Sequence, residues 1–179
     1  NPAWFIPIVG HILVPIAGVQ HASPEISWFF FSIGLLFWLV LMTIIFNRMI
    51  FHHPLPAKLL PTLFILVAPP AVGFISWVQL TGEVGVFGRL LYYAAIFLTL
   101  MLLTQARRFV GLQFFLSWWA YSFPMAAITI ATLLMYHELQ IPFFKGLGVV
   151  LLALLSVIIL TLVVKTAAAI RRREICVED

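Results

Sequence analysis

The polar side chains inside the three apolar stretches that contain proline are mostly hydroxyls, among them Thr62, Ser76, Ser117, Ser122 and Thr129. A carboxylate or an amine in the middle of a membrane marks a proton relay or a tight ion site, but the three stretches that contain proline carry neither at mid-depth. Hydroxyls and the backbone at helix bends can instead solvate an ion weakly and release it quickly. This pattern predicts passage of a weakly held ion driven by the membrane potential, and it disfavours a proton-coupled mechanism.

The five histidines do not form a pattern typical of a cofactor or metal site. A bis-histidine haem needs two histidines at similar depth on different helices, and His11 is the only one deep inside an apolar stretch. His52 and His53 are adjacent, so we expect them to point different ways and to contact solvent or lipid headgroups. His21 and His137 fall near the ends of apolar stretches. Because a glycine-rich phosphate loop, a catalytic triad and zinc-ligand spacing are also absent, we expect no cofactor, no metal and no enzyme.

The composition predicts that the elements which carry these polar side chains are membrane helices. Hydrophobic residues make up 64% of the 179 residues, charged residues make up 9%, and the mean hydropathy is +1.14, whereas soluble domains carry about 25% charged residues. Six apolar stretches each approach the roughly 20 residues that cross a bilayer: 2–20, 27–47, 59–80, 88–106, 112–136 and 146–168. Their hydrophobicity is continuous rather than alternating, which favours helices over a barrel. The predicted fold is one all-α integral membrane domain over residues 1–179.

The connections between the six stretches differ in charge. Eight of the ten basic residues fall on one side of the predicted membrane: Arg48, Lys58, Arg107, Arg108, Lys165, Arg171, Arg172 and Arg173. The connections on the other side carry Glu25, Glu83 and Glu138 with only Arg89 and Lys145 nearby. Excess lysine and arginine mark cytoplasmic loops, so both ends of the chain, including a tail at 169–179, are expected in the cytoplasm of a plasma membrane protein. The net charge of +4 therefore indicates orientation in the lipid, not nucleic-acid binding.

Prolines within the apolar stretches occur in the first, third and fifth stretches. Three pairs of prolines are each separated by 54 residues: Pro7 and Pro61, Pro15 and Pro69, and Pro70 and Pro124. We interpret this spacing as three parallel copies of one helical hairpin. Backbone groups freed by proline must be satisfied by protein or by water in a cavity. The sequence thus predicts inner helices kinked at Pro15, Pro69, Pro70 and Pro124, which line a central pore, and straight outer helices on the lipid side.

The fifth stretch carries the residue that we expect to be central. Pro124 should kink this helix and direct Phe123 away from the regular helical path. Three- and four-residue spacing on a helix brings side chains onto one stripe. On this basis the pore neighbours of Phe123 are predicted to be Leu116, Ala120, Ala127 and Ile130.

Three segments resemble one known family: SWWAYSFPM at 117–125, NPAWFIPIVG at 1–10 and VAPPAVG at 67–73. They are similar to the tellurite-resistance/dicarboxylate transporter family, which includes bacterial TehA and the plant slow-type anion channels. This resemblance implies ten helices in five hairpins around a pore, assembled as a homotrimer, and it implies that Phe123 holds the position of a phenylalanine that plugs the pore. The six stretches correspond to the fifth to tenth helices. We therefore expect two preceding hairpins of the same protein as partners of this chain.

Three functions remain open at this point. The first is a channel for small monovalent anions such as chloride or nitrate, gated by Phe123. The second is a secondary transporter of C4-dicarboxylates, sulfite or tellurite-related anions, although a carrier for a dianion should place a cation at mid-depth. The third is a membrane anchor or assembly subunit that transports nothing and has a packed interior.

Overall fold

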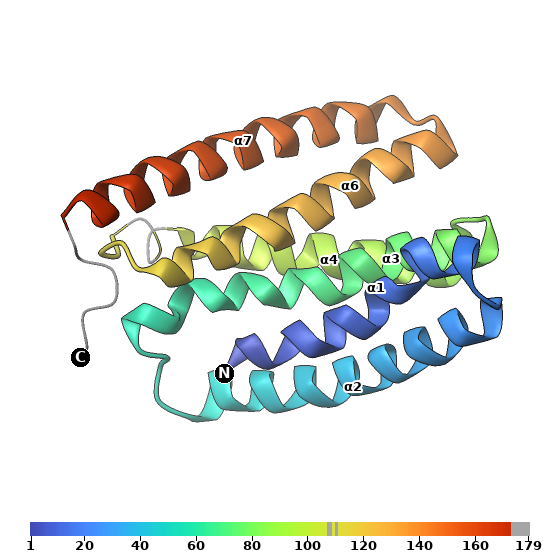
Figure 1. Ribbon diagram of the computed structural model, residues 1–179, viewed down its shortest axis with the longest axis horizontal. Coiled ribbons are helices and arrows are strands. Elements are labelled where there is room, and N and C mark those ends of the chain that lie inside the picture. Colours follow the sequence, from blue (N-terminus) through green and yellow to red (C-terminus); the bar gives the residue numbers. More distant parts are fainter. Residues whose placement is uncertain (107–108, 110, 173–179) are drawn as a thin grey trace.

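The computed structural model describes residues 1–106, 109 and 111–172, and six long apolar helices run through it (Figure 1). The all-α prediction is confirmed, and the part of the chain that is described contains no strand. The helical elements are η1 (Pro2–Trp4), α1 (Phe5–His21), α2 (Pro24–Phe51), η2 (Ala57–Val67), α3 (Ala68–Thr81), α4 (Gly85–Thr104), η3 (Leu116–Tyr121), α6 (Ser122–Leu139) and α7 (Pro142–Arg171). Each η element is a 3₁₀ helix that runs directly into the following α-helix.

The predicted boundaries differ from the observed ones at particular ends. Helices α2 and α7 begin at Pro24 and Pro142, earlier than expected, because proline is well suited to the first helical turn. Residues 112–115 lie outside the fifth helix. The expected tail at 169–179 is helical as far as Arg171, whereas residues 173–179, Arg107 and Arg108 lie outside the described residues.

The prolines mark a change of helix type. Pro7, Pro70 and Pro124 are each the third residue of their α-helix, directly after a 3₁₀ segment. A proline there costs no hydrogen bond, since the first-turn N–H groups have no intrahelical partner. The structure therefore places a junction between 3₁₀ and α-helix, not a kink inside an α-helix, at Pro69, Pro70 and Pro124. Pro15 does lie inside α1, where it cannot donate to the carbonyl of His11.

These positions also change which prolines correspond to one another in the three copies of the hairpin. If Pro7, Pro70 and Pro124 are equivalent, the first and second copies are offset by 63 residues and the second and third by 54. The first copy is longer largely because α2 has 28 residues and α4 has 20. The repeat is thus a helical hairpin of variable length rather than a fixed sequence period.

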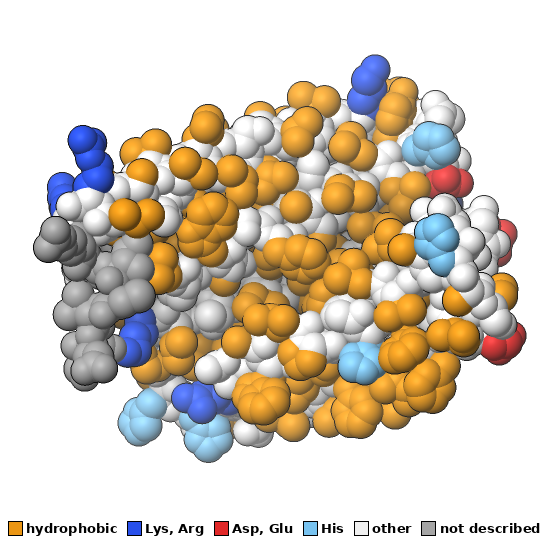
Figure 2. Space-filling view, in the orientation of Figure 1, with side chains coloured by type: hydrophobic (Ala, Val, Ile, Leu, Met, Phe, Trp, Pro, Cys, Tyr) orange, Lys and Arg blue, Asp and Glu red, His pale blue; other side chains and the backbone are white. Residues whose placement is uncertain are grey.

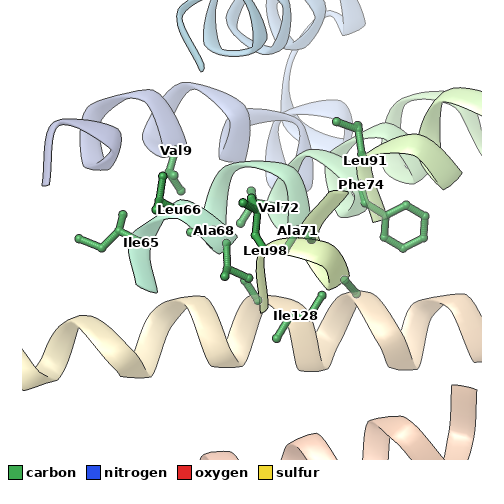
Figure 3. Packing of buried hydrophobic residues seen from close by; sticks show 14 of the residues in the cluster. Val9, Ile65, Leu66, Ala68, Ala71, Val72, Phe74, Leu91, Leu98 and Ile128 are labelled. Atoms are coloured by element: carbon green, nitrogen blue, oxygen red, sulfur yellow. The ribbon is translucent and has the colours of Figure 1, made fainter. Parts of the chain in front are cut away.

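The six helices form two layers. The inner layer consists of α1, α3 and α6, with α3 in the middle, and the outer layer consists of α2, α4 and α7. Helix α3 lies between α1 and α6, and every residue from Pro61 to Ser76 is buried (Figures 1 and 3). In the outer layer α2 packs on α1 and α3, α4 packs on α3 and α6, and α7 packs on α6. The Ser76 hydroxyl donates to the Ile12 carbonyl at 2.5 Å and joins α3 to α1. The Tyr92 and Thr132 hydroxyls, 3.2 Å apart, join α4 to α6.

Each outer helix approaches its own inner helix at a glycine. A Cβ atom added at Gly34 of α2 would lie 2.5 Å from Ile12 Cγ1, and one added at Gly148 of α7 would lie 2.5 Å from Leu133 Cδ2. At Gly88 of α4 the nearest atom would be Trp77 Cδ1, at 2.8 Å. Small residues permit close helix packing in membranes, where apolar burial alone gives little driving force. In each of the three hairpins a glycine of the outer helix therefore allows it to pack closely on the inner helix.

The two ends of the bundle differ in charge. Figure 2 shows lysine and arginine side chains gathered at the left end and acidic side chains at the right end, with apolar surface between them and one basic side chain at the acidic end. Glu25 stands in the first turn of α2, whereas Arg48 and Arg171 stand in the last turns of α2 and α7. The structure thus brings the charges that alternate along the sequence to opposite ends.

Candidate functional site

A groove of about 550 Å³ runs along the beginnings of the three inner helices. The starts of α1 and α6 and the segment leading into α3 line it, and these segments lie in the left half of Figure 1. Its twelve lining residues come from η1–α1, from η2 and from η3–α6: Ala3, Ile6, Val9, Gly10, Leu13, Thr62, Ile65, Ser117, Trp119, Ala120, Phe123 and Pro124. The 3₁₀ segments η2 and η3 pack against each other beneath it. The groove is therefore a product of the irregular starts of these helices.

Phe123 presents its ring to this groove. It is the second residue of α6, and its side chain is 45% exposed, although its neighbours Pro124 and Met125 are buried. Ile6 is the second residue of α1, directly before Pro7, and it is 60% exposed on the other wall. Two apolar side chains at corresponding positions thus face the same open space from different helices.

Side-chain hydrogen bonds fix the backbone that carries Phe123. The Ser117 hydroxyl donates to the Lys58 carbonyl at 2.5 Å, which ties η3 to η2. The Trp119 indole N–H donates to Thr166 Oγ1 of α7 at 3.1 Å, and the Ser122 hydroxyl donates to the Trp119 carbonyl at 2.7 Å. These bonds hold both ends of η3, so the start of α6 has a defined position relative to α7 and η2.

The groove is uncharged. None of its twelve described lining residues is acidic or basic, and its side-chain hydroxyls are those of Thr62 and Ser117. Thr62 donates to the Leu59 carbonyl at 2.6 Å, as Ser117 does to Lys58, so both hydroxyl protons already have backbone partners. Such a surface offers an ion little binding energy, and a site that binds weakly releases quickly.

The predicted site residues fall into three groups. Phe123, Pro124 and Ala120 line the groove. Pro15, Pro69, Pro70 and Ala127 are buried and are not among its lining residues, and Leu116 and Ile130 are about half exposed but also lie outside it.

The sequence interpretation missed the contribution of α1, notably Ile6, Gly10 and Leu13. Ile6 precedes Pro7 as Phe123 precedes Pro124, and this relation to proline is the signal that could have identified it.

Other polar candidates have local roles. The Thr129 hydroxyl donates to the Met125 carbonyl at 2.6 Å within α6. His11 lies outside the groove, with Nδ1 2.8 Å from the Pro7 carbonyl oxygen and its ring 5.6 Å from that of Phe30. Within the described residues no group of three or more His, Cys, Asp or Glu side chains could hold a metal ion. The rings of Tyr121 of η3 and Phe64 of η2 pack edge to face at 4.8 Å, which is a further contact between these two segments.

Three helical hairpins with membrane-spanning length and an uncharged groove along their inner helices define a multi-pass membrane protein. The family described as SLAC1, voltage-dependent anion channel, matches residues 1–167. The chain belongs to this family, which confirms the family inferred from the sequence motifs.

Individual relatives agree with this assignment. The chain is 35% identical over 151 residues to the S-type anion channel SLAH2 of Arabidopsis thaliana, covering 84% of this chain and 29% of the relative. It is 32% identical over 166 residues to the S-type anion channel SLAH3 of the same plant, covering 93% and 26%. An uncharacterised transporter of Methanocaldococcus jannaschii is 27% identical over 170 residues, covering 83% and 49%. The chain thus spans about a quarter to a half of the length of these relatives.

Proposed function

We propose that the groove is one side of an anion-conducting pore and that the Phe123 ring blocks it at rest. The observation that carries this proposal is the half-exposed ring of Phe123 in an uncharged groove built by three corresponding helix starts. The chain's relatives named S-type anion channels support anions as the solute, and the absence of charge among the described lining residues favours small monovalent ones. Chloride and nitrate are the anions to test first.

The packing of the outer helices supports further hairpins beside this chain. Helix α2 contacts the inner helix of its own hairpin and the next one, α3, and α4 likewise contacts α3 and α6. Continuing this pattern, α7 would contact α6 and one more inner helix, and α1 would receive a preceding outer helix. Two further hairpins of the same protein would close the ring, and the greater length of the relatives agrees with them. A homotrimer of the complete protein is part of this proposal, and native mass spectrometry tests it directly.

Conduction then requires movement of one aromatic ring. Rotation of Phe123 between staggered side-chain rotamers would open the path without a change in the packed helices. The membrane potential supplies about 2.3 kcal/mol per charge per 100 mV, which is sufficient where the walls bind the ion weakly. The basic end of the bundle would face the cytoplasm of a plasma membrane, since lysine and arginine are retained on that side.

The direct test is the chloride and nitrate current through the complete protein in a planar bilayer. Phe123→Ala should raise a small basal current at least tenfold because it removes the blocking ring. The matched control is Phe97→Ala, which removes an equally large ring that is 63% exposed on α4, outside the groove. An unchanged current in a correctly folded Phe123→Ala protein would contradict the gate. Coupled uptake of malate or sulfite without such a current would instead establish the carrier function.

A further inference from the structure

A second hollow lies at the basic end of the bundle and shares no lining residue with the groove. It has a volume of about 380 Å³, within the range of about 300 to 1,000 Å³ that is typical of small-molecule sites. Its floor is apolar and comes from three elements, with Phe46 and Met49 of α2, Leu63 of η2 and Met101 of α4 among its residues. Its rim carries Arg48, His52 and His53. We refer to these seven residues and the space between them as the basic-rimmed furrow.

The rim is a cluster of hydrogen-bond donors, and the part of the chain that the structure describes places no carboxylate beside it. Arg48 stands in the last turn of α2, the His52 backbone N–H donates to the Arg48 carbonyl at 3.1 Å, and His53 follows. All three side chains are exposed. Among the described residues, the carboxylates Glu25, Glu83 and Glu138 are at the turns of the opposite end. The guanidinium of arginine is always charged and matches phosphate oxygens, and histidine ring N–H groups can add hydrogen bonds.

The floor and the rim together restrict the occupant. Arg48 alone could be explained by its favourable interaction with the C-terminal dipole of α2, but that interaction does not account for an apolar hollow directly beside it. A free inorganic anion would use the rim and leave the floor in contact with water. A neutral acyl chain would use the floor and leave the rim unpaired. An amphiphile with an anionic head and an apolar tail uses both.

We propose that the basic-rimmed furrow binds an anionic phospholipid, with its phosphate on Arg48, His52 and His53 and an acyl chain on the floor. Its position agrees with this occupant, because the hollow lies at the last turns of the apolar helix α2, at the end of the bundle where basic side chains gather. Basic pockets between transmembrane helices are suited to lipid headgroups, and each basic residue adds to the attraction for an anionic lipid surface. Nothing in this proposal depends on conduction through the groove.

The test measures lipid retained by the purified complete protein. The protein is placed in nanodiscs of phosphatidylcholine with an equal share of phosphatidylglycerol, released gently and analysed by native mass spectrometry. Phosphatidylglycerol should be retained at least tenfold over phosphatidylcholine, and the triple variant Arg48→Gln, His52→Gln, His53→Gln should lose this preference. The matched control is Arg172→Gln, which removes a positive charge directly after α7 without altering the furrow.

A second variant separates the headgroup from the chain. Leu63→Trp should fill the floor and lower retention severalfold with the rim intact, whereas glycerol phosphate, which has the headgroup chemistry without acyl chains, should not compete at millimolar concentration. Equal retention of the two phospholipids by the wild type would overturn the proposal, as would full retention of phosphatidylglycerol by the triple variant. Competition by glycerol phosphate would show a site for free phosphate esters and would overturn it as well. Circular dichroism of both variants verifies that they are folded.

Discussion

The groove and the outer face of α4 are both apolar, yet they differ in how the backbone beneath them is built. Phe123 in the groove and Phe97 on α4 are both large exposed rings. Beneath Phe123 lie two 3₁₀ segments, proline and backbone carbonyls bonded to hydroxyls, whereas Phe97 projects from a regular α-helix without proline. In a membrane protein hydrophobic side chains cover both lipid-facing and functional surfaces. Backbone irregularity is the better guide, because irregular backbone is tolerated at membrane depth only inside protein or beside a water-filled cavity.

The strongest way to test this difference is to move the blocking ring. In a Phe123→Ala background, Ile6→Phe places a ring at the corresponding position before Pro7 on the other wall of the groove. The current gained by Phe123→Ala should fall at least fivefold, because the same space is filled from the opposite side. The control is Leu100→Phe in the same background, since Leu100 is 57% exposed on α4, outside the groove. Equal currents in the two double variants would show that position in the groove is irrelevant.

Access to water provides the second test. A cysteine introduced by Ala120→Cys should react with a membrane-impermeant thiol reagent at least tenfold faster than one introduced by Ala153→Cys, because Ala120 lines the groove and Ala153 lies outside it on the apolar outer helix α7. The native Cys176 is first replaced by serine. Labelling is followed by mass spectrometry of the complete protein in nanodiscs. An unreactive cysteine at 120 would indicate a packed interior, as expected of a membrane anchor that transports nothing.

A side chain added at a close contact between two hairpin helices should lower the stability of the protein more than a side chain added in the groove. Gly34→Val on α2 forces a side chain onto Ile12, whereas a Cβ added at Gly10 in the groove meets no atom within 4 Å. Overpacking of this kind costs about 1–3 kcal/mol, so Gly34→Val should lower the melting temperature of the complete protein clearly. Gly10→Ala should leave it nearly unchanged. If both variants melt alike, the glycine contact does not hold the hairpin together.

The sequence predicts the six spans to within a few residues at most ends, because continuous apolar stretches and flanking charges determine them. It does not predict the 3₁₀ segments. In η2 all residues from Pro61 to Val67 are buried, so packing against neighbouring helices rather than local propensity decides their geometry. Because the 3₁₀ segments are not predicted, Pro7 is aligned with the wrong proline of the second hairpin. The 54-residue spacing aligns it with Pro61, whereas its position within the helix aligns it with Pro70. The sequence identifies Phe123 and Pro124 as candidate site residues. Ile6 is identified only when Pro7 is aligned with Pro124, because Ile6 then corresponds to Phe123.

The smallest expected effect concerns the polar contact between inner helices. Ser76→Ala removes the hydroxyl that donates to the Ile12 carbonyl and joins α3 to α1, and interhelical hydrogen bonds in membrane proteins contribute on average about 0.6 kcal/mol, up to about 1.7. The control is Ser156→Ala on α7, where the hydroxyl bonds only to Leu152 of its own helix among the described residues. Unfolding of the complete protein in detergent should show a loss for Ser76→Ala and almost none for Ser156→Ala. Because α1 forms one wall of the groove, the same variant should also increase exchange of backbone amide hydrogens at the start of α1, and protection equal to that of the wild type would mean that packing alone holds this wall.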